Sequence, residues 1–233
     1  MFVRIGKKGS LNKLPLCIRA PTSLVANIMD EIHVINQLKL KRGWCFIDVG
    51  AYVGSYSVLA SRMVGEKGVV IAVEPSPYNF KALLLNTKIF KNVIPLRVAI
   101  YNKDKRKRLY YPSSTALSSL TPCAGKCVNF TEVKCVKLDT LYKEIVKGLF
   151  KINKVDAIKI DVEGAEKEVL EGGKEVLNLA KLIIVEIHGV CKMGEIKTLL
   201  NNEYGFRVRS LGRNHIIGSR TNITNKSFSK IGE

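Results

Sequence analysis

The stretch from residue 44 to residue 57 constrains the fold more than any other part of the chain. An apolar run, 44–49, leads into two glycines spaced i and i+4, Gly50 and Gly54, and then into apolar residues at helical spacing, Val53, Val58, Leu59 and Met63. A buried strand, a tight glycine turn and a helix in this order are typical of the first unit of a nucleotide-binding α/β fold. Glycine suits such a turn because it adopts backbone angles that side chains disfavour.

The charge just before the turn narrows the class of ligand. Asp48 lies at the end of the predicted strand. A helix N-terminus in this position usually faces a phosphate, which a carboxylate would repel. We therefore expect a ligand that is neutral or positive here. S-adenosylmethionine fits, because it carries a sulfonium and an ammonium and has no phosphate.

A second carboxylate follows the next apolar run. Residues 69–73 have the pattern of a strand and are followed by Glu74 and Pro75. A carboxylate at the end of this strand can accept hydrogen bonds from the two hydroxyls of a ribose. A Gly-x-x-x-Gly pattern alone is common in packed turns, but its combination with Asp48 and Glu74 predicts a binding site.

Two further strands are followed by ionisable residues. Residues 157–160 precede Asp161 and Glu163, and residues 182–187 precede His188. In an open parallel sheet the carboxyl ends of the strands line the ligand crevice. We therefore expect Asp161, Glu163 and His188 to be catalytic.

The roles of these three residues stay open at this point. Histidine has the pKa best suited to a general base at neutral pH, whereas the carboxylates would orient a hydroxyl, tune the histidine or hold a metal. Glu186 lies inside a buried run, where a carboxylate is costly unless paired. In the alternative interpretation, Asp161 and Glu163 only cap a helix and favour its first turn, and His188 binds a backbone carbonyl.

Length and composition favour one domain. The chain has 233 residues, of which 46% are hydrophobic, and this is enough to bury one sizeable core. No apolar run reaches membrane-spanning length, and the first residues lack the apolar core of a signal, so we expect a cytoplasmic protein. The six cysteines are scattered, and we expect neither a disulfide framework nor a metal site.

The formal net charge of +18 points to a different class of partner. A strongly basic chain attracts nucleic acid through its phosphates. The alternative is a lysine-rich surface without such a role, and the sequence does not separate the two. The densest basic cluster, 103–108, has the pattern of a solvated turn between two strands.

The other expected elements complete one sheet and an insertion. They are a helix over 24–38, a helix that begins at Pro77, a third strand over 93–100, the arms of a β-insertion at 109–111 and 133–136, a helix over 195–201, and strands over 206–211 and 215–218. Ala99 lies near the end of the third strand, where a small residue leaves room for a flat purine.

Four sequence motifs occur in this order along the chain: Asp48–Gly54, Val73–Pro77, Ile158–Glu166 and Val185–Glu186. Together they resemble the FkbM family of S-adenosylmethionine-dependent methyltransferases. The resemblance implies a Rossmann-like class I methyltransferase fold, with a doubly wound, mostly parallel seven-stranded sheet whose last strand is antiparallel. It also implies O-methylation of a hydroxyl on a sugar or small molecule.

The same resemblance assigns residues to the cofactor. It places Asp48, Gly50 and Gly54 at the methionine part, Glu74 at the ribose and Ala99 at the adenine. The full set of cofactor-binding residues that we expect is Asp48, Gly50, Tyr52, Gly54, Glu74, Pro75, Ser76, Ala99 and Asp161. Residues 118–120 resemble a serine-containing loop of the family.

We accordingly divide the chain into an N-terminal extension with a helix packed on the core (1–43), a methyltransferase domain (44–218) and a polar tail (219–233). The alternative is an RNA methyltransferase that uses the basic surface. It is less favoured, because the Asn-Pro-Pro-aromatic turn of adenine amino-group methylation is absent where Asp161 begins the corresponding turn. We also find no compact RNA-binding module. The sequence leaves the oligomeric state open.

Overall fold

The computed structural model describes residues 2–5, 16–19, 33–112, 118–120, 127–189 and 193–220. Its largest sheet contains β3 (Cys45–Val49), β4 (Val69–Val73), β5 (Val93–Leu96), β9 (Ala157–Ile160), β10 (Leu182–Glu186), β11 (Arg207–Leu211) and β12 (His215–Ser219). A second sheet contains β6 (Ala99–Ile100), β7 (Lys105–Pro112) and β8 (Cys127–Val136). A separate antiparallel pair is formed by β1 (Phe2–Ile5) and β2 (Leu16–Arg19).

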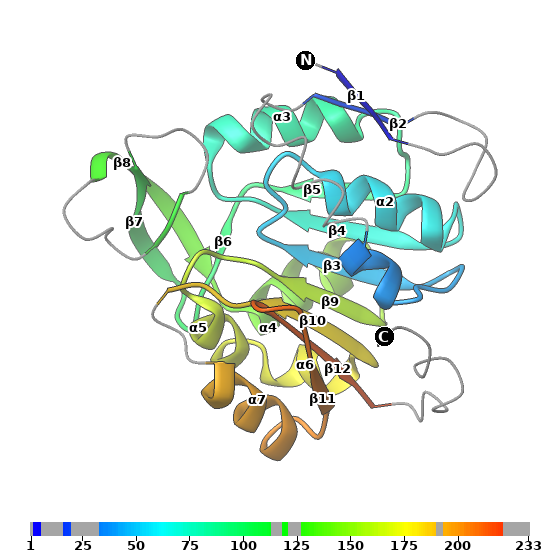
Figure 1. The fold of residues 1–233 in the computed structure, drawn as a ribbon. Helices are drawn as coiled ribbons and strands as arrows, with labels where there is room; N and C mark the ends of the chain where they lie inside the picture. The colour runs from blue at the N-terminus through cyan, green and yellow to red at the C-terminus, as the bar shows by residue number, and fades with distance from the viewer. Residues whose placement is uncertain are drawn as a thin grey trace.

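The large sheet has the strand order β11-β12-β10-β9-β3-β4-β5 (Figure 1). Neighbouring strands from β10 to β5 pair in parallel, whereas β12 is antiparallel to both β10 and β11. The prediction of a mostly parallel seven-stranded sheet with an antiparallel last strand is therefore confirmed. The chain crosses to β4 and β5 first and then returns to the other side of β3, so β3 and β9 meet at the switch point where ligands bind in such sheets.

Helices cover both faces of this sheet (Figure 1). They are α2 (Ser55–Val64), α3 (Pro77–Thr87), α4 (Leu138–Leu141), the π-helix η2 (Tyr142–Leu149), α5 (Glu166–Glu171), α6 (Lys174–Leu179) and α7 (Met193–Asn202). Residues 33–37 are also helical. No helix among the described residues is long and apolar enough to cross a membrane.

The alternation of side chains in β3 shows why both faces need a cover. Ile47 and Val49 pack in one buried cluster with residues of α4 to α7, and Phe46 packs in another with residues of α2 and α3. Successive side chains of a strand point to opposite faces, so a run that is apolar throughout must be buried on both. This is the doubly wound arrangement that the sequence predicts.

Two predicted elements differ from the structure. The predicted third strand, 93–100, is wrong in extent, because β5 ends at Leu96 and β6 leaves the large sheet to pair with β8. The basic run at 103–108 is not only a turn: from Lys105 it forms the start of β7, which extends the predicted insertion arm at 109–111 and pairs with β8. Its charges are tolerated in a strand because most of its side chains are exposed, and Lys107 lies 3.8 Å from the ring centroid of Tyr101.

Some predictions fall outside the described residues. The predicted helix over 24–38 is described only from residue 33, and the tail beyond residue 220 is not described. The division of the chain at residues 43 and 218 therefore stays a prediction.

The glycine turn is a close contact between two strand ends. Gly50 has a φ angle of +77°, and a Cβ atom on it would lie 1.7 Å from the carbonyl oxygen of Asp161. No side chain fits between these two backbones. The first glycine of the motif therefore allows β3 and β9 to end side by side.

We predict that Gly50→Ala strongly destabilises the fold. Gly43→Ala is a matched control, because Gly43 has a φ angle of +80° but nothing within 4 Å of an added Cβ. The free energy of unfolding of the control should fall by about 1–2 kcal/mol from the backbone strain alone. That of Gly50→Ala should fall by at least ~2 kcal/mol more through overpacking. Denaturant unfolding measures both, and equal losses would contradict the close contact.

Candidate active site

A cavity of about 690 Å³ lies where β3, β4, β9 and β10 end. Most of the residues that the sequence predicts for the site lie on its wall, namely Gly50, Tyr52, Glu74, Pro75, Ala99, Asp161, Glu163 and His188. Asp48, Gly54 and Ser76 do not lie on this wall. The sheet therefore brings one group of predicted residues together at the cavity and places the other group behind it.

Gly54 and Ser76 support the wall instead of forming it. A Cβ atom on Gly54 would lie 2.6 Å from Cδ1 of Leu83, so the glycine lets α3 pack closely. Ser76 is the N-cap of α3, and its side chain accepts a hydrogen bond from the Asn79 amide at 3.4 Å. The cofactor contacts predicted for the two residues stay predictions.

Glu74 follows β4 and is held by two backbone amides. Its Oε2 accepts the Tyr52 amide and its Oε1 accepts the Ser76 amide, each at 2.9 Å. Burial raises the pKa of Glu74 to about 7, although these hydrogen bonds oppose the shift. Oε1 also accepts the side-chain amide of Asn79 at 3.4 Å, so the further acceptor position is on Oε2. Ionised Glu74 can therefore accept a ribose hydroxyl at Oε2, and a second hydroxyl would compete with the long Asn79 contact at Oε1.

Two residues of the wall have strained backbones. Tyr52 and Glu163 adopt φ angles of +52° and +54°, which side-chain-bearing residues rarely populate. Ser119 holds the second of these turns, because its hydroxyl donates to the Glu163 carbonyl at 2.7 Å. Strain of this kind, about 1–3 kcal/mol per residue, persists where the surrounding structure over-determines it and is common at functional sites.

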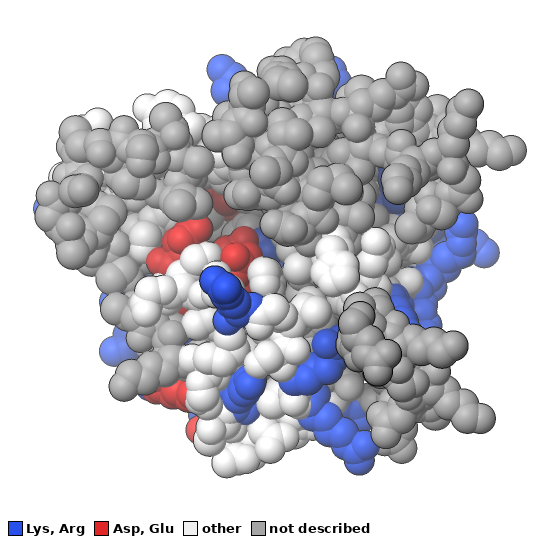
Figure 2. All heavy atoms as spheres, viewed as in Figure 1, with Lys and Arg blue, Asp and Glu red and all other residues white. Residues whose placement is uncertain are grey.

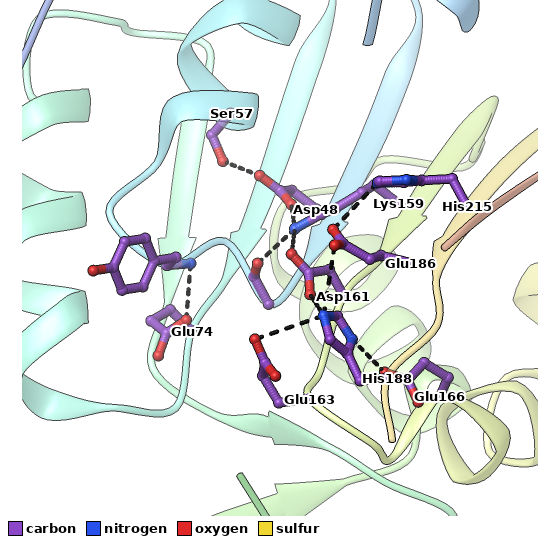
Figure 3. Close-up of polar contacts among 12 residues, drawn as sticks. Asp48, Ser57, Glu74, Lys159, Asp161, Glu163, Glu166, Glu186, His188 and His215 are labelled. Atoms are coloured by element: carbon purple, nitrogen blue, oxygen red, sulfur yellow. Dashed lines mark hydrogen bonds and ion pairs between the residues drawn. The ribbon is translucent and has the colours of Figure 1, made fainter. Parts of the chain in front are cut away.

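A buried ion pair joins β3 to β9 behind the wall (Figure 3). Lys159 Nζ lies 3.3 Å from Asp48 Oδ1 and 3.1 Å from Asp161 Oδ2. The same ammonium donates to the Gly50 carbonyl at 2.7 Å, and Ser57 donates to Asp48 at 2.6 Å. Burial would lower the pKa of Lys159, but the charges of Asp161 and Asp48 outweigh it and raise the pKa. Lys159 is therefore a cation.

This arrangement gives Asp48 a partner inside the protein, and its predicted contact with the cofactor stays a prediction. Its side chain is fully buried and faces Lys159, not the cavity in which a sulfonium would lie. Lys159 is a residue that the sequence reasoning missed. The sequence contained a signal for this role, because a lysine inside a buried apolar strand requires an anionic partner.

His188 lies among four carboxylates (Figure 3). Its Nδ1 is 3.1 Å from Oε1 of Glu166, which is fully buried. Its Nε2 faces three more carboxylates, at 3.5 Å from Glu186, 3.7 Å from Glu163 and 3.8 Å from Asp161. The histidine therefore binds side chains from β10, from α5 and from the turn after β9, and among the described residues these carboxylates take the place of the backbone carbonyl of the alternative interpretation.

These carboxylates move the pKa of His188 away from the near-neutral value on which its predicted role as a base depends. Burial alone would lower its pKa, but the hydrogen bonds with Glu166 and Glu186 and the charges nearby raise the pKa to about 11. This shift stabilises the protonated form of His188 and disfavours the histidine as a base, and the assignment of the base stays a prediction. Glu163 has the suitable value instead: burial raises its pKa to about 7, with His188 opposing and Asp161 adding to the shift.

Sequence reasoning missed two further members of this cluster. Glu166 belongs to the first turn of α5, where its charge has an ordinary explanation in the helix dipole, so no signal distinguished it. His215 begins β12, and its Nε2 lies 3.2 Å from Glu186 Oε2. Burial would raise the pKa of Glu186, but hydrogen bonds from His188 and His215 lower it well below its usual range.

Three side chains of the cluster could hold a metal ion. Asp161, Glu186 and His188 each offer a ligand atom, and these atoms lie within 4.8 Å of one another. That the reaction uses no metal stays a prediction.

The fold and the position of the site define the class of protein. A doubly wound sheet with this strand order and a cavity at its switch point is the Rossmann-like class I methyltransferase fold. Precorrin-6y C5,15-methyltransferase from Geobacter metallireducens shares it, with 14% identity, a TM-score of 0.52, and coverage of 87% of this chain and 95% of that one. Fibrillarin from Aeropyrum pernix, solved with bound S-adenosyl-L-methionine, has 14% identity, a TM-score of 0.50 and coverage of 81% and 73%.

Sequence comparison identifies the family. The model of the methyltransferase FkbM domain matches residues 48–208, and the chain belongs to this family. Hexuronic acid methyltransferase AglP from Haloferax volcanii is 30% identical over 179 residues, which cover 75% of this chain and 70% of that protein. The chain is thus a methyltransferase, and its cofactor is S-adenosylmethionine.

We predict that Lys159→Met costs about 3–5 kcal/mol of the free energy of unfolding, because it leaves buried Asp48 without its cation. The double variant Asp48→Asn/Lys159→Met should recover part of this loss, since no buried charge then lacks a partner. Denaturant unfolding of the two variants and the wild type measures the coupling. Additive losses would contradict it.

We also predict that cofactor affinity depends on pH through Glu74. Its pKa of about 7 in the free protein means that it is protonated at lower pH and must release that proton to accept ribose hydroxyls. Affinity should be constant above pH 7 and fall below it, by up to about tenfold per pH unit. Calorimetry with S-adenosylhomocysteine tests this, and Glu74→Gln should bind more weakly with no such dependence. An unchanged pH dependence in that variant would exclude Glu74 as its source.

Proposed function

We propose that the chain transfers a methyl group from S-adenosylmethionine to a hydroxyl oxygen of a sugar, with Glu163 as the general base. One observation supports the assignment of the base: the carboxylate of Glu163, with a pKa of about 7, lies on the cavity wall beside a histidine whose pKa is raised to about 11. The relative AglP is named for a hexuronic acid, which supports a sugar as the acceptor. It does not favour the RNA methyltransferase alternative.

The cofactor fits the half of the cavity beside β3 and β4. Gly50 and Tyr52 would lie against its methionine part, Glu74 and Pro75 against its ribose, and Ala99 near its adenine. A small side chain at Ala99 leaves space there, and the glycine turn exposes backbone without side chains. Asp161 lies at the border of this half, because it follows β9 in the centre of the sheet.

The acceptor would then lie above β9 and β10, where Glu163 and His188 project. The bound cofactor supplies an electrophilic methyl group, so the protein must hold an oxygen in line and remove its proton. The hydroxyl proton passes to a carboxylate oxygen of Glu163 as the new oxygen–carbon bond forms and the sulfur–carbon bond breaks. The neutral thioether and protonated Glu163 remain, and Glu163 then releases its proton to solvent.

His188 and Asp161 would position the acceptor for this step. Protonated His188 is a hydrogen-bond donor, and its charge limits the rise of the Glu163 pKa. Asp161 is an acceptor that Lys159 holds from behind at 3.1 Å. The strained turn at Glu163, fixed by Ser119, keeps the base at the wall.

We predict that Glu163→Gln lowers turnover by about 10²–10⁴-fold, the range for a positioned base, and leaves cofactor affinity within a few fold. Wild-type turnover should rise with pH up to about 7 and then level off, because the base must be ionised. The pH–rate profile of Glu163→Gln should lack this rising limb. Asp161→Asn is the comparison: it should also lose about 10²-fold but keep the limb.

The product provides a second test. Methylation of a hydroxyl gives an ether that survives mild alkali, whereas methylation of a carboxylate gives an ester that alkali cleaves. Mass spectrometry before and after alkali separates the two. A labile product, or full activity of Glu163→Gln, would overturn the role of Glu163 as a base.

A further inference from the structure

The described part of the cavity wall carries one lysine or arginine side chain that neither the cofactor nor the base would use. Its lysine and arginine side chains are Lys159 and Arg213. The ammonium of Lys159 is committed to Asp48, Asp161 and the Gly50 carbonyl. Arg213 is exposed and, within the described part of the chain, makes no hydrogen bond or ion pair. Its guanidinium is therefore available to a ligand.

Arg213 is placed by a tight turn between β11 and β12. Leu211 and His215 form the last pair of the two strands. The turn between them starts at Gly212, which has a φ angle of +62°. The carbonyl of Asn214 accepts the Ile187 amide at 2.7 Å, which ties the turn to the end of β10. This hydrogen bond places Arg213 next to the segment that contains His188.

The strand order puts Arg213 on the acceptor side. Glu74 follows β4, and Arg213 lies beyond β10 on the opposite side of the central strands β3 and β9. A cofactor held by Glu74 would extend away from Arg213. The guanidinium therefore faces the part of the cavity that we assign to the acceptor.

The floor of the same cavity is acidic. Asp161, Glu163 and Glu186 line it, and Figure 2 shows acidic side chains within a hollow of this face with basic side chains beside it. The cation of His188 is on the same floor, but its two nitrogens face the carboxylates of Glu166, Glu186, Glu163 and Asp161. An anionic group on the acceptor would therefore meet an excess of negative charge on the floor and would be attracted to the rim. A guanidinium presents paired donors that match a carboxylate in a bidentate geometry.

We infer that Arg213 binds a carboxylate of the acceptor and thereby selects sugar acids over neutral sugars. With the carboxylate at the rim, a ring hydroxyl points to Glu163 on the floor. Arg213 is then a specificity residue: it orients the acceptor and takes no part in the proton transfer. This inference rests on the proposed function and adds the chemical class of the acceptor.

Steady-state kinetics with two probe acceptors tests it. Methyl glucuronide and methyl glucoside differ in one carboxylate, and S-adenosylmethionine is kept saturating. The wild type should prefer the glucuronide by at least ~10-fold in kcat/KM, and Arg213→Gln should raise its KM for the glucuronide by about 10–100-fold, the range for hydrogen bonds to charged groups. Turnover of the glucoside and the KM for S-adenosylmethionine should not change.

Two further variants make the test specific. Arg213→Lys keeps the charge without the paired donors and should be intermediate. Arg207→Gln removes an equal charge from the same hairpin at a position off the cavity wall, and it should behave as the wild type.

Three results would overturn the inference: no preference in the wild type, an equal loss on both sugars in Arg213→Gln, or a raised KM for S-adenosylmethionine in that variant. A wild type that binds the cofactor but methylates neither sugar would instead contradict the proposed function.

Discussion

The contacts of Lys159 are the interaction on which the rest of the site depends. One buried ammonium links the end of β3 through Asp48, the glycine turn through the Gly50 carbonyl, and the end of β9 through Asp161. Two parallel strands that end in carboxylates would otherwise repel each other at a distance that Gly50 makes very short. The cation therefore allows a close switch point, where the proposed cofactor and acceptor halves of the cavity would meet.

A second effect decides which group can exchange a proton. Histidine among several carboxylates is stabilised as a cation, and each carboxylate beside it responds to its own burial and its neighbours. Glu186, between two histidines, has a lowered pKa, whereas Glu163 has one near 7. The residue type that is usually the base at neutral pH thus becomes a donor, and a glutamate becomes the group that titrates in the useful range.

Elements far from the central strands complete the site. Ser119, from the insertion, holds the strained turn at Glu163. The hairpin of β11 and β12 brings His215 to Glu186 and Arg213 to the rim. In the proposed function, the core strands would supply the cofactor half and the base. The insertion and the last hairpin would supply the contacts that set the geometry and the choice of acceptor.

The sequence by itself determined the doubly wound sheet, the glycine turn and the strand ends at which ionisable residues gather, because these follow from periodicity and from a few backbone rules. It also indicated that Glu186 needs a partner. Only the tertiary structure decided that Asp48 faces Lys159, that four carboxylates raise the pKa of His188 and that burial raises the pKa of Glu163 to about 7. Those outcomes depend on charges from segments distant in sequence, and the free energy of a buried charge is set by its neighbours in space.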